Sequence, residues 1–320
     1  MSGGEGGRDP SRPRGMVAPV MRVPTPTAGA LRGEAYRVAF EVRVDDRRLL
    51  PAVRARLPPR WRATRRAPAV VLSLGHEAGS AGMVVQVEGQ LAARELSHAQ
   101  ALDVLESELQ LSVARLARPQ VFVHAGVVTV DGRAILVPGR SGTGKTTLVR
   151  ALVAAGAIYY SDEYAVLDRE GWVHPYPRRP SVRVRGGKER HPVPRSRGRG
   201  AAPVGLVVET RYSAAARWTP VALSAGEIVL ALLANTVPAR DRPAEVLAVL
   251  ARAAGSARGI RSDRGAAART ARALIALQRN ADPGARAARS HPGGVRSPRR
   301  NASGPRDPAR GPRRRPPRSR

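Results

Sequence analysis

The sequence predicts an α/β protein, with a phosphate-loop domain built on a mixed sheet, a small α/β module before it and disordered termini. Three observations predict this class. Residues 139–147 read Gly-Arg-Ser-Gly-Thr-Gly-Lys-Thr-Thr and fit the pattern G-x-x-x-x-G-K-[ST] at every fixed position. Short apolar segments typical of strands recur along the chain, and segments with apolar residues every three or four positions follow them.

Composition divides the chain into four segments. Residues 1–33 are rich in Gly, Pro and Arg and are predicted to be a flexible leader. Residues 34–117 are predicted to form the small α/β module, and residues 118–280 the phosphate-loop domain. Residues 281–320 carry twelve arginines, eight prolines and few apolar side chains, so this tail is predicted to be disordered.

The formal net charge of +30 does not by itself indicate a nucleic-acid-binding protein. Lysine occurs only at positions 145 and 188, while the other basic side chains are arginines, as in proteins from GC-rich genomes. The arginine-rich tails have no interleaved aromatic residues, and no nucleic-acid-reading motif is recognisable. Nonspecific contact of the tail with polyanions stays open, as does an origin of the tail by read-through.

The remaining composition excludes several classes of protein. The chain contains no cysteine, so disulfides and thiolate metal sites are excluded. No apolar run reaches the roughly 20 residues of a membrane helix, and the start of the chain has no signal-peptide core. We therefore expect a cytoplasmic protein with no membrane contact.

The small module is predicted to combine strands with one helix. Order is expected to begin near Glu34. The first strand, from Tyr36 to Val44, alternates apolar and polar residues with a period of two, and further strands are expected at 69–74 and 83–88. Ser97 is the predicted cap of a helix that Pro119 ends. The module has no recognisable catalytic constellation, so packing or substrate presentation is its expected role.

A hairpin is predicted to lead into the phosphate loop. Residues 121–130 form one strand, Asp131-Gly132 is a strong turn signal, and residues 133–137 return directly into the loop. The two strands must therefore be antiparallel neighbours. A helix then follows, and a strand at 157–160 delivers Ser161, Asp162 and Glu163 at its end.

The rest of the domain is predicted from turn and capping signals. Residues 183–200 are expected to be a basic loop over the site, and residues 204–210 a strand. Ser224 to Glu227 is a capping box, and Pro243 and Arg264 begin two further helices.

The phosphate loop is predicted to bind ATP with Mg²⁺. Its glycines allow successive N–H groups to converge on phosphate oxygens, and the N-terminus of the following helix adds its positive dipole end. Lys145 would reach the β- and γ-phosphates, and the Thr146 hydroxyl would bind Mg²⁺. The predicted nucleotide-binding residues are Gly139, Arg140, Ser141, Gly142, Thr143, Gly144, Lys145, Thr146 and Thr147.

Several motifs in this order resemble the catalytic domain of HPr kinase/phosphorylase, whose fold is related to phosphoenolpyruvate carboxykinase. They are VFVHAGVV with His124-Ala125, the phosphate loop, YYSDEYAVLD with Asp162-Glu163, and VHPYPRRPSVR. The resemblance covers residues 118–280 and is closest to HPr-kinase-like bacterial proteins rather than to the classical enzyme. Glu163 stands where that enzyme has Asp, and its C-terminal signature is missing.

The resemblance implies a role for each polar residue. Asp162 would take the proton of the acceptor, Glu163 would hold Mg²⁺ with Thr146, and His124 would tune the proton affinity of the acid. Lys145 completes the catalytic set. Arg183 and Arg185 could steer an anionic substrate, although arginines are abundant throughout this chain.

Two functions follow from these residues. The first is an ATP-dependent kinase that acts on a hydroxyl of a protein, a peptide or a small molecule. The alternative is a nucleotide-binding regulatory module without phosphotransfer. The alternative needs Lys145 and Thr146 but has no need for a base at Asp162, and the sequence does not identify the acceptor.

Overall fold

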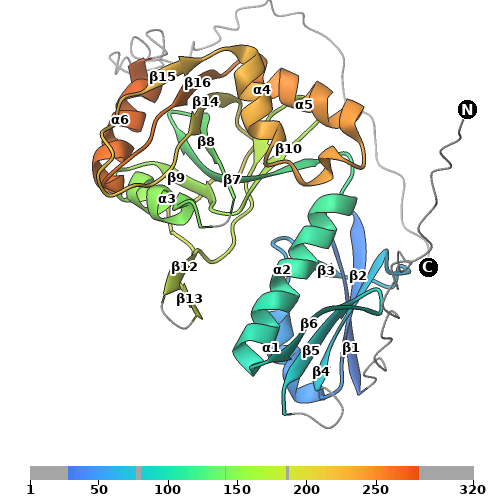
Figure 1. Ribbon diagram of the computed structural model, residues 1–320. Helices are drawn as coiled ribbons and strands as arrows, with labels where there is room; N and C mark the ends of the chain where they lie inside the picture. The colour runs from blue at the N-terminus through green and yellow to red at the C-terminus, as the bar shows by residue number, and fades with distance from the viewer. Residues whose placement is uncertain (1–27, 77–80, 141, 185–186, 281–320) are drawn as a thin grey trace, which may run out of the picture. The chain divides into compact units, whose positions relative to one another are not determined.

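The computed structural model describes residues 28–76, 81–140, 142–184 and 187–280. These residues form a mixed α/β protein with two larger sheets, one two-stranded sheet and six α-helices (Figure 1). All of them belong to one compact unit, Met1–Ala281. No helix in this described part of the chain has the length and the apolar character that crossing a membrane requires. The predicted tail and most of the predicted leader lie outside the described residues.

The first sheet has the strand order β3-β1-β2-β4-β5-β6, in which only β2 and β4 are parallel neighbours. Its strands are β1 (Gly29–Ala35), β2 (Val38–Val44), β3 (Arg62–Ala63), β4 (Val70–His76), β5 (Met83–Val87) and β6 (Gln90–Leu96). Strand β1 begins before Glu34, so the leader predicted for residues 1–33 is too long at its C-terminal end. Neither β1 nor β6 was predicted from the sequence. Strand β1 contains two glycines, and β6 has exposed polar side chains, which are not typical of strands.

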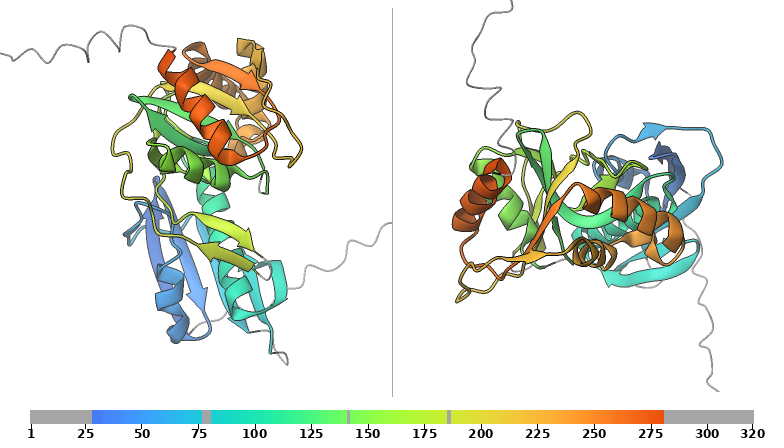
Figure 2. Two further views of the ribbon diagram at one scale, coloured as in Figure 1. Left: turned by 90° about the vertical axis from the view of Figure 1, so that its left-hand side faces the viewer. Right: turned by 90° about the horizontal axis from the view of Figure 1, so that it is seen from above.

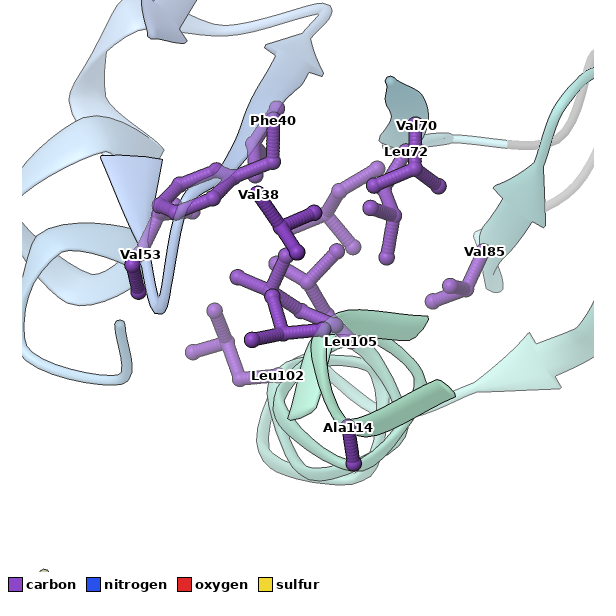
Figure 3. Packing of buried hydrophobic residues seen from close by; sticks show 14 of the residues in the cluster. Val38, Phe40, Val53, Val70, Leu72, Val85, Leu102, Leu105 and Ala114 are labelled. Carbon is purple, nitrogen blue, oxygen red and sulfur yellow. The ribbon is translucent and has the colours of Figure 1, made fainter. Parts of the chain in front are cut away.

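Helix α2 (His98–Leu116) packs along the first sheet, and α1 (Leu50–Arg54) is a shorter neighbour. Ser97 and Gln100 form a complete capping box at the start of α2, so the predicted cap at Ser97 is confirmed. Figure 3 shows Leu102 and Leu105 of α2 among the side chains of Val38, Phe40 and Leu72. The regular spacing of apolar residues in α2 is therefore used to close this core.

The second sheet is mixed and has the order β11-β10-β7-β8-β14-β16-β15, with β9 also paired to β7. Its strands are β7 (Val121–Val130), β8 (Arg133–Pro138), β9 (Ile158–Ser161), β10 (Tyr164–Leu167), β11 (Val173–His174), β14 (Val204–Glu209), β15 (Val221–Leu223) and β16 (Arg258–Arg261). The predicted hairpin is confirmed: β7 and β8 are antiparallel, and Asp131 and Gly132 both have positive φ, at 52° and 81°.

Helices cover both faces of the second sheet (Figure 2). Along β8, Ala134 and Leu136 face one core, while Ile135 and Val137 face the other, because successive strand residues point to opposite faces. Helices α3 (Lys145–Ala154) and α6 (Ala267–Asn280) pack on the second of these faces, and α4 (Ala225–Leu233) and α5 (Pro243–Gly255) on the first. The capping box of α4 and Pro243 at the start of α5 are confirmed.

Four strands of this sheet point the same way. β14 is parallel to β8 and to β16, and β9 is antiparallel to β7, as β8 is. The carboxyl ends of β8, β9, β14 and β16 therefore meet at one edge, which is where ligands bind in open α/β sheets.

The segment predicted as a basic loop, 183–200, differs from the expectation. Its first part belongs to a two-stranded antiparallel hairpin of β12 (Ser181–Val184) and β13 (Gly187–Arg190). Gly187 is the first residue of β13, while Pro192, Pro194, Gly198 and Gly200 follow that strand. Backbone pairing between β12 and β13 overrides the polar composition.

Candidate functional site

The phosphate loop connects β8 to α3, as its motif predicts. Gly142 and Gly144 have φ values of 91° and 84°, a conformation that residues with a Cβ rarely adopt. Gly144 is the N-cap of α3, so the first N–H groups of that helix open toward the loop. Ser141 lies outside the described residues. The loop has the backbone conformation and the helix end that an anionic ligand needs.

Close packing of α3 on β7 depends on Gly126. A Cβ built at this position would lie 2.5 Å from Cγ2 of Val149. The glycine therefore lets the helix approach the strand that carries His124, and this fixes the distance between the phosphate loop and β7.

The ammonium group of Lys145 lies against the first two residues of the loop. Its Nζ donates to the carbonyl oxygens of Gly139 and Arg140, at 2.6 and 2.8 Å. Burial lowers the pKa of Lys145, while the carboxylates of Glu163 and Asp162 oppose this shift. The side chain is thus held by the loop itself and faces the two carboxylates.

The acid pair, Asp162 and Glu163, stands at a break between two strands. Both β9 and β10 pair with β7, and the chain turns sharply between them. The Ser161 hydroxyl oxygen fixes this turn by accepting from the backbone N–H groups of Glu163 and Tyr164, at 3.1 and 2.9 Å. The turn directs both acidic side chains into the cavity beside the phosphate loop.

Asp162 is the carboxylate that contacts the loop. The Thr146 hydroxyl donates to its Oδ2 at 3.0 Å, and the Tyr159 hydroxyl lies 3.1 Å from its Oδ1. Burial raises the pKa of Asp162, and the guanidinium of Arg178 partly offsets this. The side chain is only 3% exposed, so it is a fixed carboxylate with an increased affinity for a proton.

Glu163 has different partners. Nη1 of Arg178 donates to its Oε2 at 3.1 Å, and Nδ1 of His124 lies 3.7 Å from its Oε1. Burial lowers the pKa of His124, with Glu163 opposing, so the imidazole is neutral at pH 7. The structure therefore places His124 beside Glu163, whereas the sequence assigned it to the proton affinity of Asp162.

Arg178 connects the acid pair to helix α2. Its Nη1 also donates to Oε1 of Gln110 at 3.1 Å, and its Nη2 lies 3.5 Å from Glu106. Burial alone would lower the pKa of Arg178, but the carboxylates of Glu163 and Glu106 outweigh it and raise the pKa. Arg178 lies in the motif VHPYPRRPSVR, but no role was predicted for it, because its partner Gln110 lies 68 residues earlier in the sequence.

A cavity of about 640 Å³ lies between the phosphate loop, the acid pair and α2. Its lining residues are Ser107, Glu108, Gln110, Leu111, His124, Gly142, Gly144, Lys145, Thr146, Thr147, Asp162, Glu163, Tyr164, Arg178, Ser181 and Val182. The small module thus supplies one wall through α2. No chemistry was predicted for this helix, because its contact with the site, from Gln110 to Arg178, spans 68 residues of chain.

The oxygen atoms around Thr146 suit Mg²⁺. A hydroxyl and two carboxylates line the same cavity, and Mg²⁺ prefers such hard oxygen ligands. Within the described ranges, no group of three or more His, Cys, Asp or Glu side chains could hold a metal ion. Mg²⁺ would therefore take most of its ligands from water and phosphate, which is its usual mode in phosphoryl-transfer sites.

Most of the predicted site residues meet in the cavity. His124, Lys145, Thr146, Asp162 and Glu163 all line it. The two predicted steering residues stay a prediction: Arg183 belongs to β12, but its side chain and the whole of Arg185 lie outside the part of the chain that the structure describes.

Comparison with known proteins adds no family assignment. The sequence matches no protein-family model, and no curated protein aligns with it significantly.

Proposed function

We propose that this chain is an ATP-dependent phosphotransferase of the HPr-kinase-like kind, which transfers the γ-phosphoryl group of ATP to a hydroxyl in the bacterial cytoplasm. The observation that carries the proposal is the 3.0 Å contact between the Thr146 hydroxyl and the Asp162 carboxylate. It brings the end of a phosphate-binding loop against a buried base. Positioning and charge neutralisation are most of what phosphoryl transfer requires.

The proposed roles follow the geometry. The phosphate loop and Lys145 bind the triphosphate, and Asp162 accepts the proton of the acceptor hydroxyl. The acceptor oxygen then bonds to the γ-phosphorus while the bond to the β–γ bridging oxygen breaks, and ADP leaves. Thr146 and Glu163 would hold Mg²⁺, which neutralises the charge of the phosphates.

Glu163 is not committed to this metal role alone. Its carboxylate already accepts from Arg178, whereas Asp162 is the carboxylate next to Thr146. The two acids could therefore exchange roles, with Asp162 toward the metal and Glu163 as the base beside neutral His124. Separate substitutions of the two acids distinguish these assignments, as set out in the Discussion.

The wall supplied by α2 favours a transferase over a regulatory module. Ser107, Glu108 and Leu111 face the cavity that also holds the acid pair. A regulatory module that only senses bound nucleotide has no need for a second cavity wall beside the acid pair. A hydroxyl-bearing acceptor would fill this space and exclude water from the γ-phosphate.

The proposal is tested first by nucleotide binding and then by transfer. Calorimetry should detect binding of Mg-ATP to the wild-type chain, and Lys145→Ala should weaken it by about 100-fold, since about two charge-assisted hydrogen bonds are lost. Phosphate labelled at the γ-position should then move to hydroxyl-bearing peptides or small molecules, with slow hydrolysis as the reaction with water.

Lys188→Ala is the matched control, because Lys188 is the only other lysine of the chain and belongs to β13 rather than to the phosphate loop. This variant should bind Mg-ATP as the wild type does. Unchanged affinity in Lys145→Ala would contradict the phosphate-loop assignment. Tight binding of ATP without hydrolysis or transfer would favour the regulatory module.

A further inference from the structure

The phosphate loop follows β8 and divides the carboxyl-end edge of the second sheet into two sides. The acid pair lies on the β7 and β9 side of β8, while β14 and β16 lie on its other side. If the proposed function holds, the γ-phosphate lies beside the acid pair. The opposite end of the nucleotide then extends away from it, toward the carboxyl ends of β14 and β16.

An exposed aromatic residue stands at this place. Tyr212 follows β14 and is 59% exposed. A Cβ built at Gly144 would lie 3.6 Å from the Cβ of Tyr212, so the tyrosine borders the phosphate loop. A backbone bridge to Arg264, beyond β16, holds its segment in place. Tyr212 therefore presents a large ring to solvent from a fixed backbone.

The side chain of Arg264 lies against this ring. Its side chain is almost fully buried, with the residue 1% exposed, and its guanidinium lies 5.5 Å from the centroid of the Tyr212 ring. Nη2 donates to the carbonyl oxygen of Gly144 at 2.8 Å. Among the described residues, no carboxylate forms an ion pair with Arg264, and its Nε has no hydrogen-bond partner. A buried cation without an acid partner favours an anionic ligand beside it.

We propose that Tyr212 and Arg264 form a nucleobase platform, on which the base of the bound triphosphate stacks. Arg264 contacts both the Tyr212 ring and the Gly144 carbonyl. The position of the base is therefore fixed relative to the position of the phosphates. Stacking on a ring needs only a π-face, so we expect GTP to bind much as ATP does and UTP to bind more weakly.

The platform is tested by comparing a ligand that has a base with one that has none. Calorimetry should measure the affinities of the full chain for Mg-ATP and for Mg-tripolyphosphate. Tyr212→Ala should weaken Mg-ATP by about 5- to 100-fold, the range for loss of one stacked base, and leave tripolyphosphate within about twofold. Tyr212→Phe should retain the affinity of the wild type, because the ring alone supplies the stack.

Trp172→Ala is the control, since Trp172 is another exposed aromatic, 47% exposed, and precedes β11 at the opposite end of the strand order from β14 and β16. It should change neither affinity. If Tyr212→Ala weakened both ligands equally, or neither, the platform would be wrong while the phosphate loop stood. If the wild type bound neither ligand, the proposed function and the platform would both fail.

Discussion

Two arginines on opposite sides of the phosphate loop are held in opposite ways. Arg178, whose side chain is 11% exposed, is compensated by carboxylates: Glu163 lies at 3.1 Å and Glu106 at 3.5 Å. Arg264 is even less exposed but has the Gly144 carbonyl and the Tyr212 ring as partners. Burial acts to lower the pKa of both arginines, but the carboxylates of Glu163 and Glu106 outweigh it at Arg178, whereas little opposes it at Arg264.

The difference separates two tasks within one site. On the acid side, charges are neutralised in advance, so the carboxylates keep a defined geometry before any substrate arrives. On the other side, positive charge is left over, which attracts the polyanionic nucleotide. Each prediction below tests one half of this contrast.

The largest effect is expected on stability, from removal of Arg178. Arg178→Met keeps much of the side-chain volume but leaves Glu163 without its buried partner and Glu106 with Arg190 as its remaining cation, so the free energy of unfolding should fall by about 3 kcal/mol or more. Urea unfolding, followed by circular dichroism, measures this. A loss well below 1 kcal/mol would show that solvent, rather than Arg178, compensates the two acids.

Removal of the proposed base should act on turnover instead. Asp162→Asn keeps the size and an acceptor for Thr146 but cannot take a proton, so turnover should fall by roughly 100-fold or more with little change in Mg-ATP affinity. Release of labelled phosphate measures turnover, and calorimetry measures affinity. Full transfer to an identified acceptor by this variant would remove Asp162 as the base.

Glu163→Gln is the comparison for that experiment. If Glu163 holds Mg²⁺, this variant should need a higher Mg²⁺ concentration for half-maximal turnover, and Asp162→Asn should not. The reverse pattern would assign the metal to Asp162 and the proton to Glu163. The contact of Thr146 with Asp162 makes this test necessary.

Local features of the fold could be predicted from the sequence. The phosphate loop, the Asp131-Gly132 hairpin and the capping boxes at Ser97 and Ser224 each depend on a few neighbouring residues, and all are present. Strand β16, with two arginines among its four residues, has no strand signal of its own. It forms because β14 and β15 lie on either side of it.

Only the part of the candidate site that contains the phosphate loop and the acid pair could be predicted from the sequence. His124, Lys145 and the acid pair were found because each lies at a strand end or in a motif. Arg178 and Arg264 were missed as site residues because their roles come from contacts with residues distant in sequence, such as Glu106 and Gly144. In a chain with this many arginines, only burial and partners distinguish the two that matter.

Removal of Arg264 should cost less stability than removal of Arg178. Arg264→Met loses hydrogen bonds to the carbonyl oxygens of Gly144 and Gly265 and one contact with a ring, but it also removes a buried cation without an acid partner. We expect a decrease of about 1 kcal/mol in the free energy of unfolding, measured as for Arg178→Met. Equal losses in the two variants would abolish the contrast between the two sides of the loop.

The smallest effect is a dependence of stability on pH that arises from Asp162. Burial raises the pKa of this carboxyl above its ordinary value of 3.8. Its favourable contribution to stability is therefore complete below that ordinary pKa and is lost as the pH rises through the raised one. At pH 8 the wild type must bury a charged carboxylate, which Asp162→Asn avoids, so the variant should melt at a higher temperature than the wild type. The difference should shrink as the pH is lowered toward 4, because the wild-type carboxyl then takes up its proton. Thermal melts of both proteins between pH 4 and 8, at about the same ionic strength, measure it, and groups common to both proteins cancel in the comparison. A difference that stayed constant over this range would mean that Asp162 keeps an ordinary pKa, and that the acid side of the loop is hydrated rather than buried.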